Sequence, residues 1–548
     1  MIIRIEDSDK SIQAVEGENL LDILRHELVD IPAICGGRGT CGKCKVQVLS
    51  GEVTTITSEE KKRLTLAEVE SGVRFACRLT VLGDIRIRLL VKTEDSDRKS
   101  KLMKLPAWSF ETIHDYTSKN SKGGYGVAFD IGTTTVVGLL WDIRTAKLMH
   151  VIARTNPQRV VGADVISRIQ YSMKSEESKN HIHELIIECL NQMIHEFTQI
   201  IEDRSLLRKI CIVGNTAMSQ IAQNMDVNQL VKPPFPQGIF TLQQYSGSNS
   251  NLAIPDETSV IYLPGIGGHV GSDITAMIVA TNIRNYEGVT LAIDIGTNGE
   301  IVLAKDGELV ACSTAAGPAF EGASIRCGMR AAKGAIEGVA INDKGVELQI
   351  IQEEEAEGIC GSGLIDAIAA MLDIGVIDET GRILELAEAI EAGVSKVIAT
   401  RLQKTPDGMQ FVLQYRYAKD PIVITQRDIR EVQLAKGAIS AGMRILMNEM
   451  GINKDSLDRI FLAGAFGSYL KIASARRIGL LPNVSLERIH SVGNAAGVGA
   501  SMAVLAKAYQ AECQVIAKTT KQVELSMHDS FQEEFVQCMN FEKVNNEQ

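Results

Sequence analysis

Residues 126–142 read GVAFDIGTTTVVGLLWD, and residues 290–307 read TLAIDIGTNGEIVLAKDG. Each stretch consists of an apolar strand, the sequence Asp-Ile-Gly-Thr and a second strand, so Asp130 and Asp294 occupy equivalent positions. The two copies are 164 residues apart. A period of this length indicates a duplicated domain rather than a solenoid.

Each copy of the repeat has the composition of a phosphate-binding turn. A buried strand brings the aspartate to a tight turn, in which glycine and hydroxyl residues leave backbone N–H groups free for phosphate oxygens. The carboxylate can hold Mg²⁺ through water, because that ion keeps much of its hydration shell. One such turn is common in ordinary hairpins, whereas two in register indicate a nucleotide site. The sequence has no G-x-x-x-x-G-K-[ST] motif, which excludes a P-loop NTPase.

A second pair of segments extends the repeat. RKICIVGNTAMSQI at 208–221 and LDRIFLAGAFGSYL at 457–470 each place glycine and small residues after a hydrophobic strand. Together with the DIGT turns, they resemble the actin, sugar-kinase and Hsp70-like (ASKHA) ATPase fold, in which two RNase H-like units bind ATP between them. The resemblance implies two phosphate loops and an adenosine loop, formed by Gly132, Thr133 and Thr134, by Gly296, Thr297, Asn298 and Gly299, and by Gly464, Ala465 and Gly467.

Four of the eleven cysteines lie in the N-terminal region, namely Cys35, Cys41, Cys44 and Cys77. Their spacing is C-x5-C-x2-C-x32-C, and the glycines of ICGGRGTCGKC let the backbone wrap closely around a buried group. Thiolates in such patterns bind zinc or iron–sulfur clusters. Structural zinc sites usually pair two C-x2-4-C segments, whereas the fourth cysteine here stands alone. The pattern favours [2Fe–2S] over zinc or four unliganded thiols.

The segments around these cysteines predict a small β-grasp unit. We expect strands at 1–5, 45–53 and 84–91 and an amphipathic helix at 19–28, with the cluster loop between the helix and the strand at 45–53. Residues 1–92 resemble the [2Fe–2S] ferredoxins, and the five-residue first gap is similar to the adrenodoxin-like branch.

The sequence therefore predicts a multidomain chain of α/β and α+β class. Residues 93–124 are rich in charge, Ser, Lys and Gly and lack an apolar period, which is typical of a flexible linker. The expected order is a β-grasp [2Fe–2S] ferredoxin domain at 1–92, the linker at 93–124, a first RNase H-like unit at 125–285, a second at 286–512 with an insertion at about 340–425, and a C-terminal extension packed on the core at 513–548.

Composition excludes several classes of partner. The chain has 57 Lys+Arg against 68 Asp+Glu, a net charge of −11, and no long basic run, so nucleic acid is not an expected partner. No apolar stretch reaches the 18 residues of a membrane-spanning helix, and the first residues lack the pattern of a signal peptide. We expect a cytoplasmic protein that does not bind membranes and whose thiols stay reduced or bind metal.

A ferredoxin joined to such an ATPase core resembles one family, the ATP-dependent reductive activators of corrinoid-dependent enzymes. Phrases that carry the resemblance include NPQRVVGADVISRI at 156–169, LPGIGGHVGSDITA at 263–276 and CSTAAGPAFEGASIRCGMRAAKGAI at 312–336. The resemblance implies that ATP drives the transfer of one electron from the cluster to the inactive Co(II) of a corrinoid protein in a methyltransferase system, giving Co(I). It also implies a low-potential electron donor and a homodimer.

Three carboxylates are the candidate catalytic residues of the core. Asp130 and Asp294 are expected to contact Mg²⁺ through water or to orient the attacking water. Glu300 follows the second DIGT turn and either polarises water or is an outward-facing strand residue. Asp273, in GGHVGSD, is a further candidate for the cleft.

Other functions are compatible with parts of the sequence. The chain could be an ATP-dependent redox activator of another low-potential enzyme, or a non-reducing ATP-driven binding scaffold with a redox-sensing cluster. A small-molecule kinase would require a sugar-like acceptor pocket, which the sequence does not reveal. Reduction of a Co(II) corrinoid in the presence of ATP distinguishes the activator from these alternatives.

Overall fold

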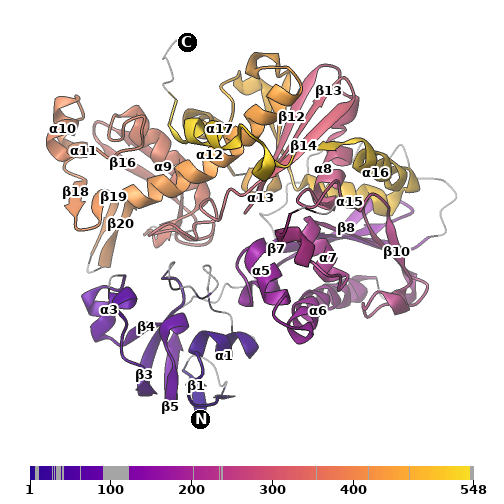
Figure 1. Cartoon of the computed structure of the whole chain (residues 1–548), viewed down its shortest axis with the longest axis horizontal. Coiled ribbons are helices and arrows are strands. Elements are labelled where there is room, and N and C mark those ends of the chain that lie inside the picture. Colours follow the sequence, from indigo (N-terminus) through magenta and orange to yellow (C-terminus); the bar gives the residue numbers. More distant parts are fainter. Residues whose placement is uncertain are drawn as a thin grey trace.

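The computed structural model (Figure 1) describes residues 1–6, 11–27, 29, 31, 37, 39, 42–61, 63–90, 123–201, 203–233, 235, 239–352, 355–417, 419–467 and 469–542. The predicted cluster ligands Cys35 and Cys41 lie outside the described residues, as do residues 93–122 of the predicted linker. None of the described helices is long and apolar enough to cross a membrane.

The N-terminal part forms a five-stranded sheet of order β2-β1-β5-β3-β4. The strands are β1 (Ile2–Ile5), β2 (Ser11–Gln13), β3 (Lys45–Val53), β4 (Val73–Phe75) and β5 (Val81–Leu89), and the helices are α1 (Leu20–His26), α2 (Ser58–Lys61) and α3 (Leu66–Glu70). β1 pairs with β5 in parallel, and the other neighbours are antiparallel. In β1 the buried Ile3 and Ile5 alternate with the exposed Ile2 and Arg4, so one face of the strand is buried against Leu20 and Leu24 of α1. This arrangement confirms the predicted ferredoxin-type fold.

The first half of the core is a six-stranded sheet of order β10-β11-β9-β6-β7-β8. Its central strand β6 is almost wholly apolar, as expected for a strand buried on both faces. The strands are β6 (Tyr125–Ile131), β7 (Thr135–Asp142), β8 (Lys147–Thr155), β9 (Leu207–Gly214), β10 (Gln243–Tyr245) and β11 (Ser259–Tyr262), and the helices are α5 (Val165–Ser172), α6 (Glu176–Ile200), α7 (Thr216–Ala222) and α8 (Ser272–Thr281).

The second half repeats this plan in a sheet of order β22-β21-β12-β13-β14-β23. β12, like β6, has an antiparallel neighbour on one side and a parallel neighbour on the other, which confirms the predicted duplication. The strands are β12 (Val289–Ile295), β13 (Gly299–Lys305), β14 (Glu308–Thr314), β21 (Arg459–Ala463), β22 (Ile489–Gly493) and β23 (Lys521–Gln522), and the helices are α12 (Gln426–Glu449), α13 (Gly464–Gly467), α14 (Ile472–Arg477), α15 (Ala495–Leu505), α16 (Lys507–Thr519) and α17 (Phe531–Met539).

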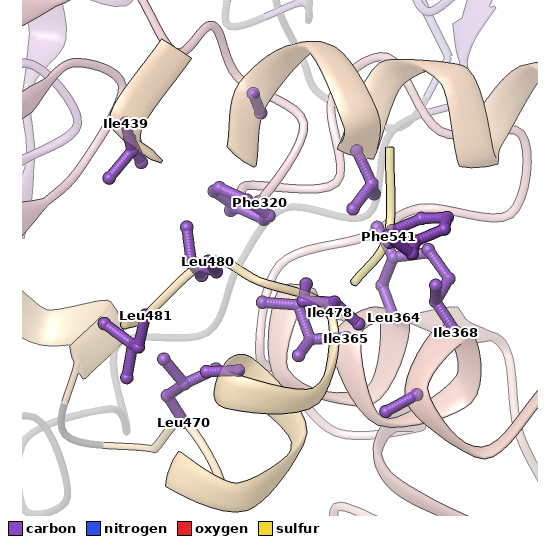
Figure 2. Close-up of a cluster of buried hydrophobic side chains, with 14 of the residues drawn as sticks. Phe320, Leu364, Ile365, Ile368, Ile439, Leu470, Ile478, Leu480, Leu481 and Phe541 are labelled. Atoms are coloured by element: carbon purple, nitrogen blue, oxygen red, sulfur yellow. The ribbon is translucent and has the colours of Figure 1, made fainter. Parts of the chain in front are cut away.

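Two three-stranded sheets lie between β14 and α12 in the sequence, in the orders β16-β15-β17 and β18-β19-β20. The end of the described chain packs beside this region, because Phe541 lies against Leu364 and Ile368 in the hydrophobic core shown in Figure 2. The elements are β15 (Ala335–Asn342), β16 (Gly345–Ile350), β17 (Gly358–Ile359), α9 (Gly361–Asp373), α10 (Leu386–Glu391), α11 (Lys396–Ala399), β18 (Leu402–Thr405), β19 (Gly408–Arg416) and β20 (Lys419–Thr425).

The two halves of the core share one of their hydrophobic clusters. Helix α15 comes from the second half but packs on β6 and β9 of the first, and also on α8. The contact with α8 is so close that a Cβ atom on Gly499 would lie 2.0 Å from the carbonyl oxygen of Ala276. Trp141 of β7 donates a hydrogen bond to Ser501 Oγ on α15, at 2.9 Å. The two halves therefore meet through interlocked elements.

Candidate nucleotide and cluster sites

The two DIGT aspartates lie at the ends of equivalent central strands, Asp130 in β6 and Asp294 in β12. Burial raises the pKa of Asp130 to about 7, with a further contribution from the negative charge of Asp294, while a hydrogen bond from Asn494 opposes the change. Burial alone raises the pKa of Asp294 to about 6. The structure thus brings the two predicted aspartates into one water-poor site.

Two more carboxylates face the same site. Glu300 lies directly opposite Asp294 in the β12–β13 register, and it is 7% exposed, so it is not the outward-facing strand residue that the sequence left possible. Asp273 begins α8. Burial raises the pKa of both groups, and charge repulsion raises it further, from Asp130 and Asp294 for Asp273 and from Asp273 and Asp294 for Glu300.

Four carboxylates that repel one another in a buried site require protons or a cation to balance their charge. No group of three or more Asp, Glu, His or Cys side chains among the described residues has the geometry to bind a metal ion directly. Mg²⁺ usually keeps several of its waters and takes only one or two protein carboxylates together with substrate phosphates. The residues present therefore fit a hydrated Mg²⁺ ion that enters with a nucleotide.

The predicted first phosphate loop is held by polar contacts to its backbone. Asn156 Nδ2 donates to the carbonyl oxygen of Gly132 at 2.8 Å, and Arg168 donates to that of Thr133 at 2.5 Å. The Thr133 hydroxyl accepts a hydrogen bond from Asn215 Nδ2 at 3.1 Å. A Cβ atom on residue 132 would lie 2.7 Å from the carbonyl oxygen of Thr135, so the turn requires glycine there.

The second phosphate loop is a similar tight turn. The Gly296 N–H donates to the carbonyl oxygen of Asn298 at 2.9 Å, and the Asn298 side chain hydrogen-bonds Glu300. Gly299 starts β13 beneath α12, where a Cβ atom would lie 2.7 Å from Ile439 Cγ1. Glycine is therefore required at position 299 for packing against α12 as well as for the turn.

The glycine loop after β21 meets the second DIGT aspartate. Gly464 has a φ of +84°, and a Cβ atom on it would lie 2.4 Å from Asp294 Oδ1. Gly464 and Gly467 begin and end the short helix α13, which also contains Ala465. The close approach of the Asp294 carboxylate explains why residue 464 is a glycine. Binding of adenosine by this loop stays a prediction.

Glu321 is a residue of the site that the sequence did not reveal. Its Oε2 accepts a hydrogen bond from Thr134 Oγ1 at 2.9 Å, and its Oε1 accepts one from Thr297 Oγ1. The carboxylate therefore bridges the two phosphate loops. Glu321 stands in the phrase GPAFEGAS, which has no spacing that marks a nucleotide ligand, so only the tertiary structure identifies it.

A group of arginines lies near the predicted first phosphate loop. Arg168 is fully buried, and burial lowers its pKa to about 9, with Arg330 and Arg159 adding repulsion while Asp164 and Glu321 oppose it. Burial and the charge of Arg330 lower the pKa of Arg159 to about 10. Three guanidinium groups near one loop are suited to the charge of a triphosphate.

The described part of the cluster site contains two of the four predicted ligands. Cys44 precedes β3, and Cys77 lies in the 3-10 turn Ala76–Arg78; their sulfur atoms are 3.4 Å apart. This distance is too long for a disulfide bond and allows both thiols to bind one metal group. The thiol chemistry and the converging sulfurs fit an iron–sulfur cluster.

The chain as a whole combines a ferredoxin domain with an ASKHA ATPase core. The sequence matches the "2Fe-2S iron-sulfur cluster binding domain" over residues 3–82, the "RACo middle region" over 125–286 and the "C-terminal domain of RACo the ASKHA domain" over 288–548. These matches favour a [2Fe–2S] cluster over zinc and assign ATP with Mg²⁺ to the core.

Relatives of similar length extend this result. The chain is 31% identical to corrinoid activation enzyme RamQ of Eubacterium limosum, with 92% of this chain and 93% of RamQ covered. It is 28% identical to the [Co(II) methylated amine-specific corrinoid protein] reductase of Methanosarcina barkeri, with 72% of each chain covered. A solved structure described as "Reductive activator for corrinoid,iron-sulfur protein" covers 98% of both chains at 28% identity, with a TM-score of 0.67. The protein belongs to the RACo family.

Replacing Asp130 with Asn is expected to stabilise the nucleotide-free core in a pH-dependent way. The folded-state pKa of about 7 lies above the ordinary value of 3.8, so the folded protein holds this proton more tightly and loses stability as the pH rises through this range. The neutral amide does not titrate, so the advantage of the variant should grow by about 2 kcal/mol between pH 5.5 and pH 8. Urea unfolding followed by tryptophan fluorescence measures this difference, and an advantage independent of pH would show that Asp130 titrates normally.

Proposed function

We propose that this protein reactivates a corrinoid protein by ATP-dependent one-electron reduction of inactive Co(II) to Co(I). One observation carries the proposal: a cluster-binding ferredoxin domain and an ATPase core lie on one chain that aligns over nearly its full length with a corrinoid activation enzyme. The partner is then a corrinoid protein of a methyltransferase system. The electron comes from a low-potential donor and passes through the [2Fe–2S] cluster.

The energetics explain why such a reaction needs ATP. A ferredoxin-type [2Fe–2S] centre has a potential of about −400 mV, and each 59 mV of unfavourable difference costs about a factor of ten in a one-electron equilibrium. Reduction of Co(II) to Co(I) is harder than reduction of such a cluster. Binding or hydrolysis of ATP can favour a conformation in which cobalt loses a ligand and becomes easier to reduce, provided that ATP binds the two conformations differently.

The proposal gives each group of residues one task. Cys35, Cys41, Cys44 and Cys77 bind the cluster. Asp130 and Asp294 hold the hydrated Mg²⁺ or orient water, and the deep burial of Glu300 beside them supports a part in polarising water. The remaining residues bind the nucleotide: Gly132, Thr133, Thr134, Gly296, Thr297, Asn298 and Gly299 contact phosphate, and Gly464, Ala465 and Gly467 contact adenosine.

The arrangement of the chain serves the same task. We propose a ferredoxin domain at 1–92 on a flexible linker at 93–124, RNase H-like units at 125–285 and 286–512, and a C-terminal extension at 513–548. A tether lets the cluster approach cobalt while the core binds the same partner. It keeps the ferredoxin domain at a high effective concentration near the partner that the core has bound. The proposal also includes a homodimer located in the cytoplasm.

Anaerobic absorbance spectroscopy tests the function directly. The reduced protein is mixed with a Co(II) corrinoid protein, with and without Mg–ATP, and formation of Co(I) is followed. We expect Co(I) to accumulate only with ATP. Absence of Co(I) under both conditions, with a reduced cluster and measurable ATP hydrolysis, would favour an activator of another low-potential enzyme or an ATP-driven scaffold.

A further inference from the structure

Glu321 occupies the position where the phosphates of ATP are proposed to bind. It accepts hydrogen bonds from the hydroxyls of Thr134 and Thr297, and both hydroxyls are assigned to phosphate in the proposed function, on which this inference rests. A carboxylate and a phosphate are both anionic acceptors, so they compete for the same two donors. Thr134 follows β6 and Thr297 follows β12, and the carboxylate therefore also ties the two halves of the core together.

The backbone around Glu321 is firmly held in the second half of the core. The preceding Phe320 is 3% exposed and points into the hydrophobic core near Ile439 and Leu480 in Figure 2. The loop that follows is closed on itself, since a Cβ atom on Gly322 would lie 2.8 Å from backbone atoms of Met329. Displacement of Glu321 is thus a movement of its side chain, which breaks this link between the two halves without unfolding the loop.

The same loop contacts the ferredoxin domain. Lys43, next to Cys44, donates a hydrogen bond to the carbonyl oxygen of Ile325 at 2.9 Å, and that of Gly328 lies at 3.4 Å. The loop lies between β14 and β15 in the sequence. Lys43 therefore contacts the second half of the core. The cluster-binding segment is therefore docked a few residues from Glu321.

The ferredoxin domain also lies close to the first half of the core. Tyr171 of α5 has a pKa that is raised mainly by burial, and the charges of Arg25 and Asp22 on α1 are near enough to contribute. Figure 1 shows the N-terminal sheet beside the core on the side of α5 and β20. A domain that is hydrogen-bonded to the second half and lies near the first keeps this placement only while the halves hold their relative orientation.

We propose that Glu321 is an internal competitor of the ATP phosphates, and that its displacement by ATP frees the two halves of the core to re-orient and undocks the ferredoxin domain. The nucleotide-free state is then the docked state. ATP binding opens the Glu321 bridge and allows the cluster-binding domain to leave the core, so that it can reach a partner protein.

Nucleotide affinity tests the competition. The full-length protein with its cluster is titrated anaerobically with Mg–AMPPNP by calorimetry, in wild-type, Glu321→Ala and Glu321→Gln forms. Glu321→Ala should bind the nucleotide about tenfold more tightly, because the nucleotide no longer has to displace the carboxylate from the two threonine hydroxyls. Glu321→Gln should also bind it more tightly. Glu308→Ala, at the exposed start of β14, is the matched control and should bind as the wild type does.

Two outcomes of the titration are decisive and distinct. Weaker binding by Glu321→Ala or Glu321→Gln would overturn the inference, because it would make Glu321 a ligand of the nucleotide or its Mg²⁺. Failure of the wild-type protein itself to bind the nucleotide would instead overturn the proposed nucleotide site.

Photo-crosslinking tests the undocking. Benzoylphenylalanine replaces the exposed Arg326, which stands between the two carbonyl groups that Lys43 contacts. Without nucleotide, the label should crosslink to the segment around residue 43, and Mg–AMPPNP should lower the yield at least about threefold. With Glu321→Ala added, the yield should be low from the start. Equal yields with and without nucleotide in a protein that binds it would overturn the undocking.

Discussion

Replacing Asp294 with Ala is expected to lower ATP-dependent reduction of a Co(II) corrinoid by about 10²-fold to 10⁴-fold, the usual cost of losing a positioned general base or its equivalent. Asp294 lies where the predicted second phosphate loop, Gly464 and Glu300 meet. The neighbouring carboxylates come from other positions and cannot replace it at the end of β12. The absorbance of the cluster should not change, because all four predicted ligands belong to the N-terminal domain.

ATP hydrolysis and Co(I) formation by the purified variant measure this effect. Asp420→Ala removes an exposed aspartate near the start of β20 and serves as the control, with activity expected close to that of the wild type. Turnover of Asp294→Ala within a few-fold of the wild-type rate would show that the second DIGT turn does not serve the nucleotide.

Replacing Cys77 with Ser is expected to abolish the visible absorbance of the [2Fe–2S] cluster and with it all electron delivery. The Cys77 sulfur lies 3.4 Å from that of Cys44, and a serine hydroxyl is a much poorer ligand for iron than a thiolate. The ferredoxin domain should also become less stable, because cluster binding adds to its folding free energy. Affinity for Mg–ATP should stay within about twofold of the wild type, because the core supplies that site.

Cys189→Ser, in helix α6 of the core, is the control for the loss of one thiol and should keep the cluster. An iron-free wild-type protein that holds one tightly bound zinc ion would contradict the assignment of the cluster. An active Cys77→Ser variant with unchanged absorbance would remove Cys77 from the ligand set.

The local sequence predicted the parts of the site that form within one turn. The DIGT segments have apolar strands that can only be central, and the close contact at Gly132 admits no side chain. The duplication and the ferredoxin-type fold were therefore predictable. The chemical roles of the loop residues stay predictions.

Contacts between distant segments were not predictable from the sequence. Glu321 meets Thr134 from 187 residues away, and no periodicity or spacing connects them. For Glu300 the sequence left two orientations open, and only the pairing of β12 with β13 places it opposite Asp294. These contacts depend on how the strands pair and how the two halves of the core pack, which local sequence patterns do not determine.

The placement of α15 determines the order in which the protein can be made. This helix, at residues 495–505, covers β6 and supplies the Ser501 partner of Trp141, 360 residues earlier in the chain. During synthesis the first sheet leaves the ribosome long before its cover exists, and its apolar face stays open to other chains meanwhile. A nascent chain of this protein is therefore a natural client for chaperones, and a fragment that ends before α15 should aggregate rather than fold.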